Sequence, residues 1–200
     1  VTGITDYFCE NYRPRIFKAS KYLESNYEKD KQAIIDRYNK DGYRDAHIVS
    51  DSVYKIDEKN IGIAINLEEG DKYYFRDITW VGNTKYDTTV LNRVLGINKG
   101  DVYNKELLQN NLQYQEGGYD VSSLYMDDGY LFFQVDPVEL RVENDSIDLE
   151  IRLYEGDQAT IGQVTVTGNT KTNDYVAVRE LYTKPGQLFS RSDIIRTTRE

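Results

Sequence analysis

The chain has 200 residues, with 25 Lys or Arg against 34 Asp or Glu, so its formal net charge is -9. This acidic balance disfavours nucleic acid and anionic lipid as partners, because both carry negative charge. The single cysteine, Cys9, excludes an intrachain disulfide, and one histidine, His47, leaves no Cys/His cluster for zinc. No apolar run reaches the length of a transmembrane helix.

The first part of the chain is predicted to contain a helix and a strand. Apolar residues at helical spacing run without a break up to the turn Asp41-Gly42-Tyr43: Tyr27, Ile34, Ile35 and Tyr38. Further on, an apolar residue at every second position predicts a half-buried strand: Ile61, Ile63, Ile65 and Leu67. Residues 1–16 match no pattern.

The central part begins with a predicted strand over 74–81, bounded by Gly70-Asp71 and Gly82-Asn83. A helix follows, capped by Asp87 or Thr88 and ended by Gly96. A second helix starts at Asn104. Its apolar pattern breaks at Gly117-Gly118 and resumes up to Asp128-Gly129, so we expect a kink or loop at the two glycines.

Two strands are predicted to close this central part. The stretch 130–135 is aromatic and apolar, and Pro137 argues against a central position in a sheet. After a turn at 143–146, apolar residues alternate with mostly charged ones: Ile147, Leu149, Ile151 and Leu153. This alternation predicts a strand with one face on the helices and the other in water.

The last part starts the same pattern again. Caps at 172–174 precede a helical stripe formed by Val176, Val178 and Leu181, and Pro185-Gly186 stops that helix. The run Ser190-Arg191-Ser192-Asp193 approximates a capping box, which predicts the start of a second helix.

These parts are copies of one module. Residues 61–114 match residues 147–200 at 15 of 54 positions, with a constant offset of 86 and no gap. Asp41-Gly42-Tyr43 recurs as Asp128-Gly129-Tyr130 at an offset of 87. The phase gives one complete β-α-α-β-β module between two incomplete ones, so we expect an excerpt of a longer protein. An array of modules favours a binding surface or spacer over a single catalytic cleft.

This module resembles the POTRA domain, and the middle and last copies resemble the membrane-proximal POTRA domains of BamA-type outer-membrane assembly factors. The resemblance spans about residues 17–200 and rests on short motifs in a fixed order: Asp41-Gly42-Tyr43, Glu69-Gly70, Gly82-Asn83, Gly100-Asp101, Asp128-Gly129-Tyr130, Glu155-Gly156, Gly168-Asn169, Arg179-Glu180-Leu181, Pro185-Gly186 and Phe189-Ser190. It implies an α+β fold of tandem modules, each a three-stranded mixed sheet packed against two helices.

The resemblance also implies a division into domains. A parent protein with five POTRA domains would place a partial third domain at 1–68, a complete fourth at 69–155 and the N-terminal half of a fifth at 156–200. The expected role is a scaffold at the periplasmic face of the outer membrane, which receives unfolded outer-membrane proteins and docks accessory lipoproteins. A C-terminal β-barrel would anchor the parent chain. No catalytic residue, cofactor, metal or nucleic acid is implied.

Strand addition offers a physical route for such binding, because an exposed sheet edge presents unpaired backbone groups. In the POTRA fold the strand after the Gly-Tyr turn lies at an edge, which here is Leu131, Phe132, Phe133, Gln134 and Val135. We hypothesise that this strand receives clients or a partner. The alternative is that its aromatic side chains fill the core and pack on the neighbouring domain.

The junctions between modules supply a second hypothesis. Glu69 and Gly70, and again Glu155 and Gly156, stand where the last strand of one domain meets the first strand of the next. They would act as limited hinges that let the array bend. The alternative is a tight turn in which each glycine adopts a positive φ, and both descriptions can hold together.

Other functions stay open. The POTRA region of a related secretion or translocation transporter would share the fold. A metal-dependent enzyme fragment would have to use the loose spacing of Asp45, His47 and Asp51, which lacks ligands and a second shell. A carbohydrate-binding module, suggested by the 18 tyrosines, fits poorly with two helices per unit.

Overall fold

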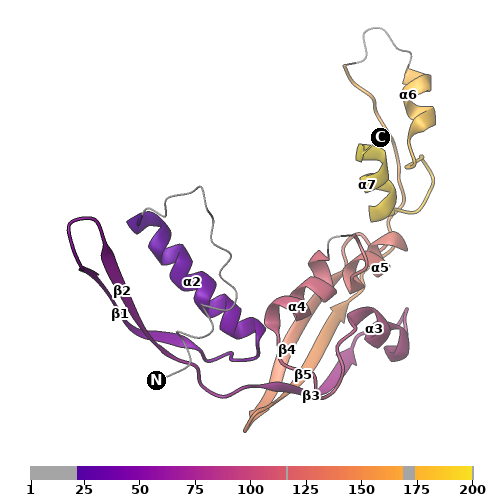
Figure 1. Cartoon of the computed structure of the whole chain (residues 1–200). Coiled ribbons are helices and arrows are strands. Elements are labelled where there is room, and N and C mark those ends of the chain that lie inside the picture. Colours follow the sequence, from indigo (N-terminus) through magenta and orange to yellow (C-terminus); the bar gives the residue numbers. More distant parts are fainter. Residues whose placement is uncertain (1–21, 116, 169–173, 200) are drawn as a thin grey trace. The chain divides into compact units, whose positions relative to one another are not determined.

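The computed structural model describes residues 22–115, 117–168 and 174–199 (Figure 1). Cys9 and the predicted caps at Thr172 and Asn173 lie outside the described residues. Contacts divide the chain into the units Val1–Ile34 and Ile35–Glu200. Helix α2 (Glu24–Lys40) crosses this division and ends at the turn around Gly42, as the sequence predicts.

The first module contributes an antiparallel hairpin of β1 (His47–Lys55) and β2 (Ile61–Glu68), with a bulge between Ile48 and Ser50. The Asp57 carboxylate holds the connecting turn, because it accepts from the backbone N–H groups of Lys59 and Asn60, each at 2.8 Å. The sequence therefore closes this hairpin locally, through a side-chain-to-backbone turn.

The middle module contains a three-stranded mixed sheet in the order β3-β5-β4. Strand β3 (Tyr74–Val81) runs parallel to β5 (Ser146–Tyr154), and β4 (Gln134–Glu143) runs antiparallel to β5. Between β3 and β4 the chain forms α3 (Thr88–Leu95), α4 (Lys105–Gln109), the π-helical turn η1 (Asn110–Tyr114) and α5 (Val121–Asp127). The expected α+β fold with a three-stranded mixed sheet is confirmed.

Side-chain caps start the helices of this module. Asp87 accepts from the N–H groups of Thr89 and Val90 to start α3, which ends at left-handed Gly96. Asn104 caps α4 and Asp120 caps α5. The pattern break at 117–118 is confirmed, because η1 ends before these glycines and α5 begins after them.

One face of the sheet packs on the helices, and the core lies between them. The inward residues of β5 are almost fully buried, and the Tyr125 ring from α5 stacks on Phe133 at 4.1 Å between centroids. The core consists of Tyr73, Phe75, Leu91, Leu95, Ile97, Tyr103, Leu108, Leu112, Val121, Tyr125, Phe133, Val135, Ile147, Leu149, Ile151 and Leu153. The alternation along 147–153 therefore predicted the buried face of β5 correctly.

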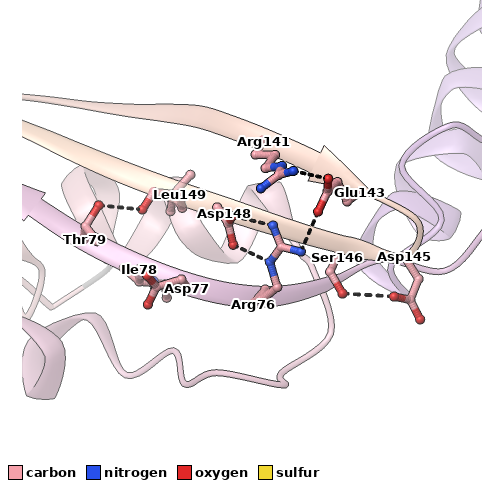
Figure 2. A network of polar contacts seen from close by, with 10 residues as sticks. All are labelled: Arg76, Asp77, Ile78, Thr79, Arg141, Glu143, Asp145, Ser146, Asp148 and Leu149. Carbon is pink, nitrogen blue, oxygen red and sulfur yellow. Dashed lines mark hydrogen bonds and ion pairs between the residues drawn. The ribbon is translucent and has the colours of Figure 1, made fainter.

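The opposite face of the sheet carries a network of charged side chains (Figure 2). Arg76 of β3 makes a bidentate contact with Asp148 of β5, with its Nε 2.7 Å from Oδ1, and its Nη1 lies 3.1 Å from Glu143 of β4. Hydrogen bonds to these carboxylates raise the pKa of Arg76 and lower that of Asp148. This network links all three strands on the face turned to water.

The last part of the chain forms α6 (Asp174–Glu180) and α7 (Arg191–Arg199). Its isolated bridge Thr160↔Leu188 repeats the bridge Tyr74↔Val102 of the middle module at the same offset in sequence. Ser190 accepts from the Asp193 N–H at 3.2 Å, as the capping-box pattern predicts for the start of α7.

Candidate functional site: edge strands and domain junctions

The five residues predicted as a client-binding strand do not form one strand. Strand β4 begins at Gln134, so Leu131, Phe132 and Phe133 lie in the turn before it. Phe133 and Val135 are buried in the core, whereas Phe132 is 65% exposed. The predicted start of the strand, at residue 130, was wrong. Phe133 packs its ring on Tyr125 in the core, and the residues that pair with β5 begin only at Gln134.

Strand β4 does lie at an edge of the sheet, since among the described residues it pairs only with β5. Part of this edge is protected. The Val135 carbonyl accepts from the Gln113 side-chain amide at 2.8 Å, and Pro137, two residues on, has no N–H. A proline is tolerated in a ladder where its nitrogen points away from the neighbouring strand. A bulge between Glu139 and Arg141 interrupts the pairing further on. These are devices that natural sheets use to discourage strand addition.

The hairpin of the first module has a more open edge. Strands β1 and β2 pair only with each other among the described residues, and neither contains a proline. Apolar side chains on both strands are well exposed, including Val49, Val53, Ile61 and Ile63. Long, exposed and partly apolar edges are the ones most able to accept another strand.

The two junctions between modules repeat the same backbone contacts. The Tyr73 N–H donates to the Gly42 carbonyl at 3.0 Å, and the Ala159 N–H donates to the Gly129 carbonyl at 2.8 Å. Both glycines have positive φ, and a Cβ at Gly42 would meet Val102, whose counterpart Leu188 lies beside Gly129. The repeated Gly-Tyr turn therefore places the start of the next module against the preceding one.

Side chains make the first junction polar. Arg44, in the turn after α2, forms an ion pair with Glu139 of β4 at 2.7 Å. The Tyr103 hydroxyl donates to Glu139 at 2.6 Å, and the Tyr73 hydroxyl donates to Asp45 at 2.8 Å. Burial and the hydrogen bond to Glu139 raise the pKa of Tyr103, so its hydroxyl stays a donor.

The second junction uses other groups. Asp127, at the end of α5, accepts from the Ser192 N–H at 2.7 Å and from the Ser190 hydroxyl at 3.2 Å, at the start of α7. Arg191 donates to Ser123 at 3.1 Å and lies 4.0 Å from the fully buried Asp120 carboxylate. The positions that correspond to Arg44 and Asp45 are Leu131 and Phe132, so this junction lacks the charged cluster of the first.

The residues predicted as hinges occupy different environments. Gly70 and Gly156 both have positive φ, at 71° and 68°, which fits a tight turn. The Glu155 side chain accepts from the N–H groups of Thr84 and Lys85 and from the Tyr125 hydroxyl, whereas Glu69 is exposed. Burial acts to raise the pKa of Glu155, but these hydrogen bonds outweigh it and hold the pKa below its usual value.

A shallow groove of about 630 Å³ lies beside the start of β4. It is lined by Gln113, Ser122, Met126, Phe133, Gln134, Val135 and Arg191. The only predicted client-binding residues in it are Phe133, Gln134 and Val135. Sequence reasoning gave no binding role to Arg44, Gln113, Glu139 and Arg191, because each acts through a partner that is distant in the chain.

Within the described ranges, no group of three or more His, Cys, Asp or Glu side chains is arranged to hold a metal ion. Of the loosely spaced trio weighed for a metal site, His47 contacts the Asp45 backbone carbonyl at 2.9 Å through Nδ1. No helix among the described residues is long and apolar enough to cross a membrane.

The family model described as "POTRA: Surface antigen variable number repeat" matches residues 11–70, 73–156 and 159–200. The chain therefore belongs to the POTRA family. A crystal structure of Haemophilus influenzae BamA POTRA3-5 has the same fold, with a TM-score of 0.64 and 22% identity over 90% of this chain and 69% of that chain.

Curated relatives point to the BamA type. The outer membrane protein assembly factor BamA of Nitratidesulfovibrio vulgaris is 29% identical over 85% of this chain and 21% of its own length. BamA of Neorickettsia risticii is 24% identical over 90% of this chain and 24% of its own length. The prediction of a BamA-type POTRA region is confirmed, and the chain spans about a fifth to a quarter of these relatives.

Proposed function

We propose that this chain is part of the binding scaffold of an outer-membrane β-barrel assembly machine, at the periplasmic face of the outer membrane. Membership of the POTRA family and the BamA relatives support this role. On this proposal the modules are the third, fourth and fifth POTRA domains of a longer protein anchored by a β-barrel. They receive unfolded outer-membrane proteins and dock accessory lipoproteins, and they carry no catalytic site.

We propose that clients bind by adding a strand to a sheet edge. The observation that carries this is that β1 and β4 each have one side without a strand partner among the described residues. Main-chain hydrogen bonds then supply affinity with little demand on client sequence. Since Gln113 and Pro137 protect the first half of β4, β1 is the edge more open to a client. Of the residues 131–135 predicted to receive clients, Gln134 and Val135 lie in the strand, and the Val135 carbonyl already accepts from Gln113.

Site-specific photo-crosslinking tests this proposal. A crosslinker is placed at Ser52 of β1, at Gln134 of β4 or at Glu150 of the central strand β5, and an unfolded outer-membrane protein is added. Glu150 is the control, because both edges of β5 are already paired. We expect adducts from Ser52 in the highest yield, fewer from Gln134 and none above background from Glu150. Equal yields at all three positions, or none at any, would contradict strand addition.

We propose that the Glu-Gly linkers allow the array of modules to bend only to a limited extent. At the second linker Glu155 is tied to the loop after β3, and the Gln158 amide donates to the Asp128 carbonyl at 2.8 Å. Each such bond must break before the linker can swing. Small-angle scattering of the intact array would show a single rigid profile if the linkers hold.

A further inference from the structure

The first junction contains five side chains that contact one another from two modules. We name them the latch cluster: Arg44 and Asp45 from the turn after α2, and Tyr73, Tyr103 and Glu139 from the middle module. The Arg44 guanidinium lies 2.7 Å from the Glu139 carboxylate and 3.5 Å from that of Asp45. The Arg44 and Glu139 side chains are 29% and 30% exposed, so the pair is shielded on much of its surface.

The aromatic members enclose the charged pair. The guanidinium lies 5.5 Å from the centre of the Tyr73 ring and 5.8 Å from that of Tyr103. Both hydroxyls then donate to the carboxylates of the cluster, Tyr103 to Glu139 and Tyr73 to Asp45. A planar, delocalised guanidinium suits this combination of ion pair and ring contacts better than lysine does.

The cluster exists only while the two modules stay in contact. Arg44 and Glu139 are 95 residues apart, and Glu139 stands on edge strand β4 beside its bulge. An exposed ion pair contributes little, but a half-buried pair with ring and hydroxyl contacts contributes more. The backbone bond from Tyr73 to Gly42 has a counterpart at the second junction, whereas the latch cluster has none.

We propose that the latch cluster holds the first junction in one arrangement, and that this depends on the charge of Arg44. When the Arg44–Glu139 pair is removed or screened by salt, the backbone hydrogen bond from Tyr73 to Gly42 remains, and the two modules can rotate about it. The second junction has apolar Leu131 and Phe132 in place of Arg44 and Asp45, so removal of the Arg44–Glu139 pair leaves its arrangement unchanged.

Distances between spin labels test this proposal. Labels at Ser52 and Thr89 span the first junction, and labels at Thr89 and Lys184 span the second, each on a full chain with Cys9→Ser. The variant Arg44→Met keeps the aliphatic length and removes the charge. Arg152→Met is the matched control, because Arg152 pairs with Glu150 at 2.7 Å inside the middle module.

We expect Arg44→Met to replace the single narrow Ser52–Thr89 distance peak by a broad distribution, with the Thr89–Lys184 peak unchanged. About 1 M salt, which shortens the Debye length to about 3 Å, should broaden the same peak in the wild type. Arg152→Met should leave both peaks narrow, and the charge swap Arg44→Glu with Glu139→Arg should restore part of the lost peak. An unchanged peak in Arg44→Met, or equal broadening at both junctions, would overturn the proposal.

Discussion

Glu155 connects three parts of the middle module through one carboxylate. Its Oε1 accepts from Thr84 N at 2.8 Å, from Lys85 N at 3.0 Å and from the Tyr125 hydroxyl at 2.9 Å, and the Thr84 hydroxyl donates to Oε2. The loop after β3, helix α5 and the end of β5 therefore meet at this residue. Hydrogen bonds to a charged acceptor are among the stronger ones in proteins.

Glu155→Gln is expected to lower the free energy of unfolding by about 1–2 kcal/mol at pH 7, because the amide keeps one acceptor but loses the charge. The pKa of Glu155 is held below its usual 4.5, so its contribution is full above that pH and is lost as the pH falls through the folded value. Urea unfolding should show a larger difference in the free energy of unfolding between the wild type and Glu155→Gln at pH 7 than near pH 3. A constant difference at both pH values would argue against this assignment.

At the scale of elements, glycines fix how strands end and turns close. Gly82 follows β3 at φ 89°, and a Cβ there would lie 2.3 Å from the Leu153 carbonyl oxygen of β5. Gly100 has nearly the same φ, 90°, but no atom lies within 4 Å of its Cβ position. The two positions therefore separate the cost of the backbone conformation from the cost of a clash.

Gly100→Ala is expected to cost about 1–2 kcal/mol, the usual penalty for a side chain in the left-handed region. Gly82→Ala should cost about 1–3 kcal/mol more, because the methyl group must displace the β5 backbone. Thermal or chemical unfolding of both variants against the wild type measures the difference. Equal losses in the two variants would mean that the close approach to Leu153 relaxes without cost.

Contacts between elements also determine which sheet edge is protected. Proline in the sequence of β4 suggested an edge, but only the fold shows that Gln113 from η1 covers the Val135 carbonyl next to it. The same fold leaves the β1–β2 hairpin with exposed apolar side chains and no such cover among the described residues. The edge strands β1 and β4 therefore differ in how open they are to another strand, although their modules share the same sequence motifs.

At the scale of the whole molecule, the junctions combine a repeated backbone contact with side chains that differ. The second junction depends on Arg191, the first residue of α7, which reaches Ser123 and the buried Asp120 in the middle module. A buried carboxylate that loses its positive partner is destabilising. Arg191 is therefore expected to couple the last module to the middle one.

Arg191→Ala should lower the free energy of unfolding by about 1–2 kcal/mol, because the buried Asp120 carboxylate loses its positively charged neighbour and keeps the bonds from the Ser123 N–H and hydroxyl. Hydrogen exchange should become faster in α7 and around the Thr160–Leu188 bridge, while β5 stays protected. Arg179→Ala is the control, since Arg179 is well exposed and forms an ion pair with the adjacent Glu180 at 2.9 Å. Faster exchange in β5 itself would show that Arg191 supports the middle module rather than the junction.

The sequence by itself determined the features that depend on local chemistry. A helix start at Asp87 or Thr88, another at Asn104, the break at Gly117-Gly118 and the buried face of β5 all follow from propensities and spacing within a few residues. The short motifs in their repeated order also resembled the POTRA domain, and that resemblance implied the mixed sheet. These signals survive in one sequence because each is a property of a short segment.

Only the tertiary structure decided which side chains meet across the chain. Phe133 turns into the core instead of joining β4, Gln113 covers an edge carbonyl, and Arg44 reaches Glu139 over 95 residues. Such contacts leave no periodic or compositional trace, because their energy depends on where two distant segments are placed by the packing of everything between them. The packing decided that Arg44 and Glu139 meet at the first junction and that Arg191 reaches Asp120 at the second.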